Sequence, residues 1–194
     1  PMPHRVDCPD RGGAAAVPPQ PDGPRGRDLD AGWLNPAYVA LGSNLDDPRA
    51  QVERALDALA GIQDSRLVLR SSLYRTRPFG PVEQPDFVNA TAGLLTALSP
   101  AELLAELQSL EIRLGRERPA VRWGPRRIDL DLLVHGTNRR DEPGLTLPHP
   151  GIADRAFVLV PLAEIAPDLM VPALGRVRAL LACVDRSGVE RISP

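Results

Sequence analysis

Two hydrophobic patterns alternate along the middle of the chain. Short apolar runs predict buried strands, and apolar positions three or four residues apart predict helices. The first run, Tyr38–Leu41, ends at Gly42-Ser43-Asn44, which has the composition of a turn. The next pattern predicts a helix that begins at Pro48, after an aspartate cap, and ends at Gly61.

The later patterns complete a β-α-β-β-α-β series. The second helix begins with a capping box formed by Ser99 and Glu102, and Gly115 ends it. Strands are expected at 67–74, 87–97 and 128–134. This order predicts an α+β fold with a ferredoxin-like split-βαβ core, in which helices cover both sides of an antiparallel sheet. Beyond it lie an apolar segment at 157–165 and a last helix near 174–183.

Residues 1–36 differ in composition from the rest of the 194-residue chain. They contain 8 of its 22 Pro and 5 of its 16 Gly, and they lack periodic hydrophobicity. Such a segment buries too little apolar surface to offset the entropy of ordering it. We therefore expect a disordered tail at 1–36 and a single folded domain at 37–194.

The basic residues are all arginine, since the sequence contains no lysine. This excludes Walker-type phosphate loops, Schiff-base lysines and pyridoxal phosphate sites. A net charge of −2 argues against electrostatic attraction to nucleic acid or to anionic membranes. No apolar run is long enough to span a bilayer, and the N-terminal residues lack a secretory signal. We expect a cytoplasmic protein with neither a nucleic-acid nor a membrane partner.

Two aspartates on the strand at 128–134 are the strongest chemical signal. Because side chains alternate along a strand, Asp129 and Asp131 lie on one face, and Ile128, Leu130 and Leu132 on the other. Paired carboxylates repel each other unless a cation neutralises them, and hard oxygen ligands suit Mg²⁺. The alternative is a solvated polar face of an edge strand.

An arginine-rich loop precedes this strand. Between Gly115 and Arg127 the sequence contains five Arg and Trp123. Arginine binds phosphate oxygens through two parallel hydrogen bonds, so the loop and the aspartates together indicate a nucleotide–metal site. A charged surface loop balanced by nearby acidic residues is the alternative.

Other residues suit a flat, polar ligand. Phe87 and Asn89 share one face of a strand, which combines a stacking surface with an amide. Arg155 and Phe157 are again two residues apart, and His149 lies in a rigid Pro-His-Pro turn. Each of these could equally be a core aromatic, a surface polar group or a packed loop residue.

Several of these motifs occur in the order found in a known enzyme family. They are Ala40–Leu45, Ser72–Thr76, Gln84–Ala90, Glu111, Gly115-Arg116, Arg122–Arg126, Asp129–Asp131 and Leu147–Pro150. Together they resemble the family of 6-hydroxymethyl-7,8-dihydropterin pyrophosphokinases, which belongs to folate biosynthesis. The resemblance extends from about Tyr38 to about Asp168.

The resemblance implies a ferredoxin-like enzyme that transfers pyrophosphate from ATP to the pterin hydroxymethyl group and releases AMP. It implies two Mg²⁺ ions on Asp129 and Asp131, catalytic roles for Arg116 and Arg126, and a monomer acting on small molecules. The positions that match ATP contacts are Gln108, Glu111, Arg122, Trp123, Ile128, His149 and Arg155. Those that match the pterin pocket are Gly42, Ser43, Asn44, Thr76, Pro78, Phe79, Phe87, Asn89, Trp123 and Phe157.

Two other functions stay open on the residues alone. Ferredoxin-like domains with an aspartate pair also serve nucleotidyltransferases and polymerases, which release free pyrophosphate. A non-catalytic RNA-binding module of the same fold is the second alternative. Its usual aromatic platform is difficult to build from a chain with 4% aromatic residues.

Overall fold

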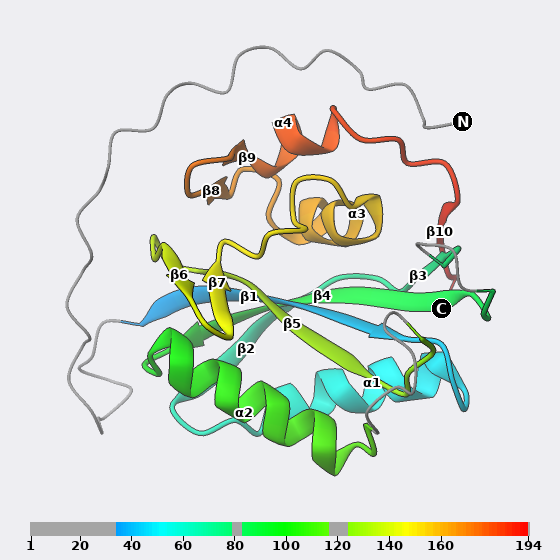
Figure 1. Ribbon diagram of the computed structural model, residues 1–194, viewed down its shortest axis with the longest axis horizontal. Coiled ribbons are helices and arrows are strands. Elements are labelled where there is room, and N and C mark those ends of the chain that lie inside the picture. Colours follow the sequence, from blue (N-terminus) through cyan, green and yellow to red (C-terminus); the bar gives the residue numbers. More distant parts are fainter. Residues whose placement is uncertain (1–33, 79–82, 117–123, 194) are drawn as a thin grey trace.

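The computed structural model describes residues 34–78, 83–116 and 124–193. A central antiparallel sheet has helices on both faces (Figure 1). Helices α1 (Pro48–Leu59) and α2 (Pro100–Arg113) cover one face, and α3 (Ala156–Ile165) and α4 (Val177–Leu181) lie over the other. No helix in the described ranges is long and apolar enough to cross a membrane.

The main sheet follows the order β10-β3-β4-β1-β5, with β2 also paired to β4. Its strands are β1 (Asn35–Ser43), β2 (Ser65–Arg70), β3 (Tyr74–Thr76), β4 (Phe87–Thr96), β5 (Asp129–His135) and β10 (Val189–Arg191). Two small hairpins lie outside it: β6 (Arg140–Glu142) with β7 (Leu145–Leu147), and β8 (Met170–Val171) with β9 (Gly175–Arg176). The element order and the placement of the helices confirm the α+β, ferredoxin-like prediction.

Both predicted helix starts are present. The Asp47 side chain accepts the Ala50 N–H at the start of α1, and Pro48 occupies the first turn. At α2, Ser99 and Glu102 form the reciprocal capping box. Each cap satisfies backbone N–H groups that have no partner inside the helix.

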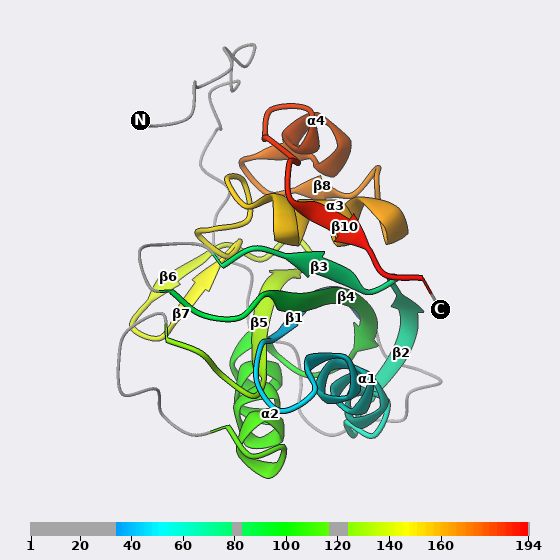
Figure 2. The same cartoon turned by 90° about the vertical axis from the view of Figure 1, so that its right-hand side faces the viewer.

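The strand expected at 67–74 is divided into β2 and β3. The division occurs at Ser71, whose side-chain Oγ accepts the Thr91 N–H at 2.9 Å in place of a backbone carbonyl. Both pieces pair with β4, so β4 is continuous while its neighbour is broken. At the outer edge, β10 pairs with β3 (Figure 2).

Two other boundaries differ from expectation. The segment at 157–165 is helix α3, which is apolar on most sides and therefore has little periodicity to detect. Strand β1 begins at Asn35, so Asn35 and Pro36 belong to the sheet and not to the expected tail. Residues 1–33 lie outside the described residues, and the disordered tail stays a prediction there.

Two apolar layers pack against the sheet. Leu41, Leu130 and Leu132 contribute to the layer under α1 and α2, and Leu133 and Val134 to the layer under α3 and α4. Asp129 and Asp131 alternate with the first group, so they point to the α3 side. The alternation in β5 therefore places the two carboxylates on the face where the cavity opens.

Candidate active site

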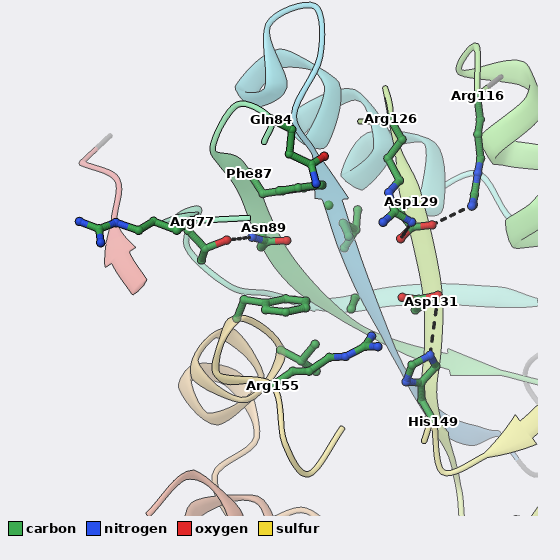
Figure 3. A pocket seen from close by; sticks show the side chains of 16 residues that line it. Arg77, Gln84, Phe87, Asn89, Arg116, Arg126, Asp129, Asp131, His149 and Arg155 are labelled. Atoms are coloured by element: carbon green, nitrogen blue, oxygen red, sulfur yellow. Dashed lines mark hydrogen bonds and ion pairs between the residues drawn. The ribbon is translucent and has the colours of Figure 1, made fainter. Parts of the chain in front are cut away.

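A cavity of about 320 Å³ lies between the sheet and the start of α3 (Figure 3). Its volume suits a small-molecule ligand. Residues from β1, β3, β4, β5, α3 and the adjoining loops line it. They are Ala40, Leu41, Gly42, Thr76, Arg77, Gln84, Phe87, Asn89, Arg116, Arg126, Asp129, Asp131, His149, Arg155, Phe157 and Val158.

Asp129 and Asp131 form the acidic part of the cavity. Two arginines bind Asp129: Arg116 Nη1 lies 2.9 Å from its Oδ1, and Arg126 Nη1 lies 2.7 Å from its Oδ2. Burial and the neighbouring Asp129 charge raise the pKa of Asp131. A cation beside this carboxylate would favour its ionised form.

Helix α2 supports this acidic group through Glu111, which is 5% exposed. Glu111 Oε1 accepts the Leu130 N–H at 2.7 Å and also accepts a hydrogen bond from Arg116. Burial raises the pKa of Glu111 to about 7, although the Leu130 N–H and the Arg116 charge act in the opposite direction. Arg116 therefore lies between two carboxylates, Glu111 and Asp129.

His149 approaches the other aspartate. The Gly151 N–H donates to His149 Nδ1 at 3.1 Å, which leaves Nε2 directed to Asp131 Oδ1 at 4.0 Å. Burial lowers the pKa of His149. The neutral imidazole therefore has its proton on Nε2, where it can be donated to an anionic ligand.

The guanidinium of Arg155 lies against Gly151, in the space that a side chain there would occupy. A Cβ on Gly151 would lie 2.5 Å from Arg155 Cζ, so a larger residue would displace the guanidinium from this position. Arg155 also stacks on Phe157, with Cζ 5.8 Å from the ring centroid. These contacts place a cation and an aromatic ring from the start of α3 side by side in the cavity wall.

The second part of the cavity combines aromatic surface with an amide. Asn89 Nδ2 donates to Thr76 Oγ1 at 2.7 Å, so its orientation is fixed by the neighbouring strand. A Cβ on Gly42 would lie 3.0 Å from Asn89 Oδ1 and 3.9 Å from Phe87. Glycine at position 42 therefore gives this amide and this ring the space they occupy.

The cavity brings together most of the predicted site residues that the structure describes. Those that line it are Gly42, Thr76, Phe87, Asn89, Arg116, Arg126, Asp129, Asp131, His149, Arg155 and Phe157. Glu111 contacts Arg116 from behind the lining. Phe79, Arg122 and Trp123 lie outside the described residues.

Five other predicted residues do not line the cavity. Ile128 is fully buried in the layer under α1 and α2, so its side chain has no surface for ATP. Gln108 is exposed on α2, and Pro78 is half-buried beside Thr76. Ser43 and Asn44 are buried where β1 ends, and protein groups hold the Asn44 amide.

Sequence reasoning missed several lining residues, among them Arg77, Gln84 and Ala40. Ala40 pairs with Asp131, and Gly42 pairs with both Asp129 and Asn89. Ala40 and Gly42 are both small and lie on one face of β1. This pattern could have been recognised in the sequence as a surface on which a ligand can lie. The Arg77 side chain extends away from the aspartates (Figure 3).

The acidic residues provide too few ligands to hold a metal ion alone. No group of three or more His, Cys, Asp or Glu capable of holding one occurs in the parts of the chain that the structure describes. Two hard carboxylates suit Mg²⁺, because this ion usually keeps several waters and shares its coordination with substrate phosphates. The donor set therefore fits magnesium that binds together with a nucleotide.

Residues 38–167 match the family described as 7,8-dihydro-6-hydroxymethylpterin-pyrophosphokinase (HPPK). The chain belongs to the HPPK family. It is 49% identical to the 2-amino-4-hydroxy-6-hydroxymethyldihydropteridine pyrophosphokinase of Pseudomonas aeruginosa over 155 residues, which cover 80% of this chain and 95% of the relative. It is 48% identical to the protein of the same name from Haemophilus influenzae over 136 residues, or 70% of this chain and 84% of the relative.

Solved structures of HPPK-DHPS from Plasmodium falciparum share the fold. The wild-type structure with pteroate superposes with a TM-score of 0.63 at 14% identity. The match covers 83% of this chain and 48% of the Plasmodium falciparum chain. Membership of the HPPK family gives the chain its function, which is pyrophosphoryl transfer from ATP to hydroxymethyldihydropterin in folate biosynthesis.

Proposed function

We propose that the cavity is the active site of this transfer, with the pterin beside Phe87 and Phe157 and the ATP phosphates beside Asp129 and Asp131. One observation carries the proposal: the fixed amide of Asn89, both aromatic rings and the aspartate–arginine cluster line the same cavity. A pterin is flat and has hydrogen-bonding groups along its edge, so it requires stacking and a positioned amide. A triphosphate requires cations.

We propose that Asp129 and Asp131 hold Mg²⁺, two ions by family resemblance, when ATP binds. These ions would neutralise the triphosphate and polarise the β-phosphorus. Arg116 and Arg126 both bind Asp129. Each has a guanidinium that can exchange this carboxylate for phosphate oxygens of similar geometry.

In the reaction, the pterin hydroxymethyl oxygen forms a bond to the β-phosphorus and loses its proton to solvent. The bond from this phosphorus to the α–β bridging oxygen breaks, and the bridging oxygen leaves with AMP. Such transfers depend on positioning and charge neutralisation more than on a covalent nucleophile. Arg116 and Arg126 would offset the charge that develops on the transferred group and on the departing AMP. Glu111, His149 and Arg155, with Gln108, Arg122 and Trp123, are proposed to contact ATP.

We further propose that the protein works as a cytoplasmic monomer on small molecules alone, without nucleic-acid or membrane partners. Its net charge of −2 supports this view. Size-exclusion chromatography with light scattering tests the monomer: a dimer mass at micromolar concentration would contradict it.

Product analysis tests the proposed reaction. The protein is mixed with Mg²⁺, ATP and 6-hydroxymethyl-7,8-dihydropterin, and the products are followed by phosphorus NMR. AMP and the pterin diphosphate should form in equal amounts, and chelation of Mg²⁺ should stop both. Release of free pyrophosphate would indicate nucleotidyl transfer, and ADP would indicate an ordinary kinase.

A further inference from the structure

Asn44 is positioned by the protein on every side. It is 2% exposed, it follows directly after β1, and it does not line the cavity. Its backbone N–H donates to the Arg126 carbonyl at 3.1 Å, and its Oδ1 accepts the Arg126 N–H at 2.8 Å. Asn44 thus binds both backbone polar groups of Arg126, three residues before β5 begins, and fixes the backbone of Arg126.

The amide nitrogen of the same side chain binds a second segment. Asn44 Nδ2 donates to Gln84 Oε1 at 3.0 Å and to the Pro85 carbonyl at 3.2 Å. Pro85 lies two residues before Phe87, where β4 begins. These bonds therefore fix the entry of the chain into the strand that supplies the aromatic ring.

One side chain consequently joins two parts of the cavity wall. Arg126 Cζ lies 5.9 Å from the centroid of the Phe87 ring, although the two residues are far apart in sequence. We propose that Asn44 is a positioning residue that holds Arg126 and the Gln84–Phe87 segment in register with each other. It acts through these residues, and both donors of its amide are already used by the protein.

This inference rests on the roles proposed above for Arg126 and Phe87. The Asn44 side chain has two arms: the Oδ1 arm is its hydrogen bond with Arg126, and the Nδ2 arm is its hydrogen bonds with Gln84 and Pro85. The inference predicts that these two arms affect different kinetic constants. The Oδ1 arm fixes the arginine and should affect kcat. The Nδ2 arm fixes the aromatic wall and should affect KM for the pterin.

The two arms can be separated by substitution. Asn44→Ala removes both arms and should lower kcat and raise the pterin KM, each by about tenfold, the effect of one buried hydrogen bond. Asn44→Asp keeps the acceptor for Arg126 but loses both donors, so it should regain most of the lost kcat while the pterin KM stays raised. Gln84→Leu removes one acceptor of the second arm and should raise only the pterin KM.

Asn138→Ala is the matched control. Asn138 is a half-buried amide, less buried than Asn44, and its Nδ2 donates to the His135 carbonyl at 3.0 Å, away from the cavity. This variant should lose thermal stability but leave both kinetic constants unchanged. If Asn44→Ala lowers stability like Asn138→Ala without changing the constants, Asn44 is only structural and the inference is wrong.

Arg126→Ala and Phe87→Ala separate this inference from the proposed function. If neither lowers kcat or raises the pterin KM, the proposed site is wrong. If both do so and Asn44→Asp fails to separate kcat from KM, the site stands and the positioning role of Asn44 is overturned. If both Asn44 variants fold poorly, Gln84→Leu still tests whether the Nδ2 arm affects the pterin KM.

Discussion

Glu111 Oε1 accepts the backbone N–H of Leu130 at 2.7 Å. Leu130 lies between Asp129 and Asp131, so a buried carboxylate on helix α2 holds the backbone of the strand that presents both aspartates. Three acidic groups are thereby concentrated in one small region, and Arg116 lies between two of them. This arrangement concentrates negative charge that cations bound with ATP can offset.

The titration of Glu111 should appear in the stability of the folded protein. Burial raises its pKa from 4.5 to about 7, so between these values the folded state retains a proton that the unfolded state has lost. Stability from this group is therefore fully present below pH 4.5 and decreases as the pH rises to about 7, by at most about 1.4 kcal/mol per pH unit. Urea unfolding between pH 5 and pH 7.5 measures this slope.

Glu111→Gln is the test variant, because it keeps an acceptor for the Leu130 N–H and cannot ionise. Its unfolding free energy should vary less with pH than that of the wild type over this interval. A slope equal to that of the wild type would assign the titration to another group. Glu53→Gln is a suitable control, since this exposed carboxylate pairs with Arg49 on the surface of α1.

Asp131→Asn should separate stability from catalysis. Burial and the Asp129 charge raise the pKa of Asp131, so its ionised form is disfavoured. The neutral variant should therefore unfold at a higher temperature than the wild type and lose its Mg²⁺-dependent turnover. A variant with substantial turnover in Mg²⁺ would contradict the metal assignment, and a lower melting temperature would contradict the charge argument.

Arg116→Ala should reduce turnover by a large factor, on the order of a hundredfold, with little change in ATP affinity. The reason is that its guanidinium binds Glu111 and Asp129 and would reach phosphate only as charge develops. Turnover and binding of a fluorescent ATP analogue measure the two effects. Arg113→Ala, at an exposed residue bonded to Ser109, is the control. Loss of ATP binding would make Arg116 a ground-state anchor.

Gly42→Ala tests the floor of the proposed pterin pocket. The new methyl group would lie 3.0 Å from Asn89 Oδ1, so the amide must shift and the hydrogen bond to Thr76 must lengthen. The pterin KM should rise by about tenfold or more, with ATP binding unchanged. Gly61→Ala is the control, because its Cβ would meet only the Ala58 carbonyl at 3.4 Å. An unchanged pterin KM would show that the pterin lies elsewhere.

The sequence predicted the local features of this fold better than its long-range ones. The caps at Asp47 and Ser99 depend on residues three positions apart, and the aspartate face of β5 depends on simple alternation. The break between β2 and β3 was not predictable, because it involves a hydrogen bond that Ser71 Oγ accepts from the N–H of Thr91, twenty residues away. Helix α3 was missed because almost all of its faces are apolar.

The same distinction applies to the site. The pairs predicted from residues two positions apart, Phe87 with Asn89 and Arg155 with Phe157, all line the cavity, and their roles toward a ligand stay predictions. Ile128 shares its strand with the aspartates but points to the opposite face, where it is fully buried. Asn44 lies beside cavity residues in sequence, yet its role depends on Arg126 and Gln84, which only the folded chain brings to it.

Glu164 should stabilise the packing of α3 against the edge of the sheet formed by β3 and β10. It accepts the Ser72 N–H at 2.8 Å, the Ser72 hydroxyl at 2.7 Å and the Tyr74 hydroxyl at 3.0 Å, and it pairs with Arg191 of β10. Glu164→Ala should therefore reduce the unfolding free energy at pH 7 by about 2 kcal/mol. Glu142→Ala is the control, because this exposed residue forms a long ion pair of 3.4 Å with Arg140 and should cost less than about 0.5 kcal/mol.

The effect of Glu164→Ala should also depend on pH in a defined direction. Although burial acts in the opposite sense, the hydrogen bonds from Ser72 and Tyr74 and the Arg191 charge hold the pKa of Glu164 below its usual value of 4.5. A depressed pKa contributes stability above 4.5 that is lost as the pH falls through the lower, folded-state value. The difference between wild type and variant should therefore be full at pH 7 and smaller at pH 3.5. A difference that stays constant over this range would mean that Glu164 stabilises the strand by packing and not by its charge.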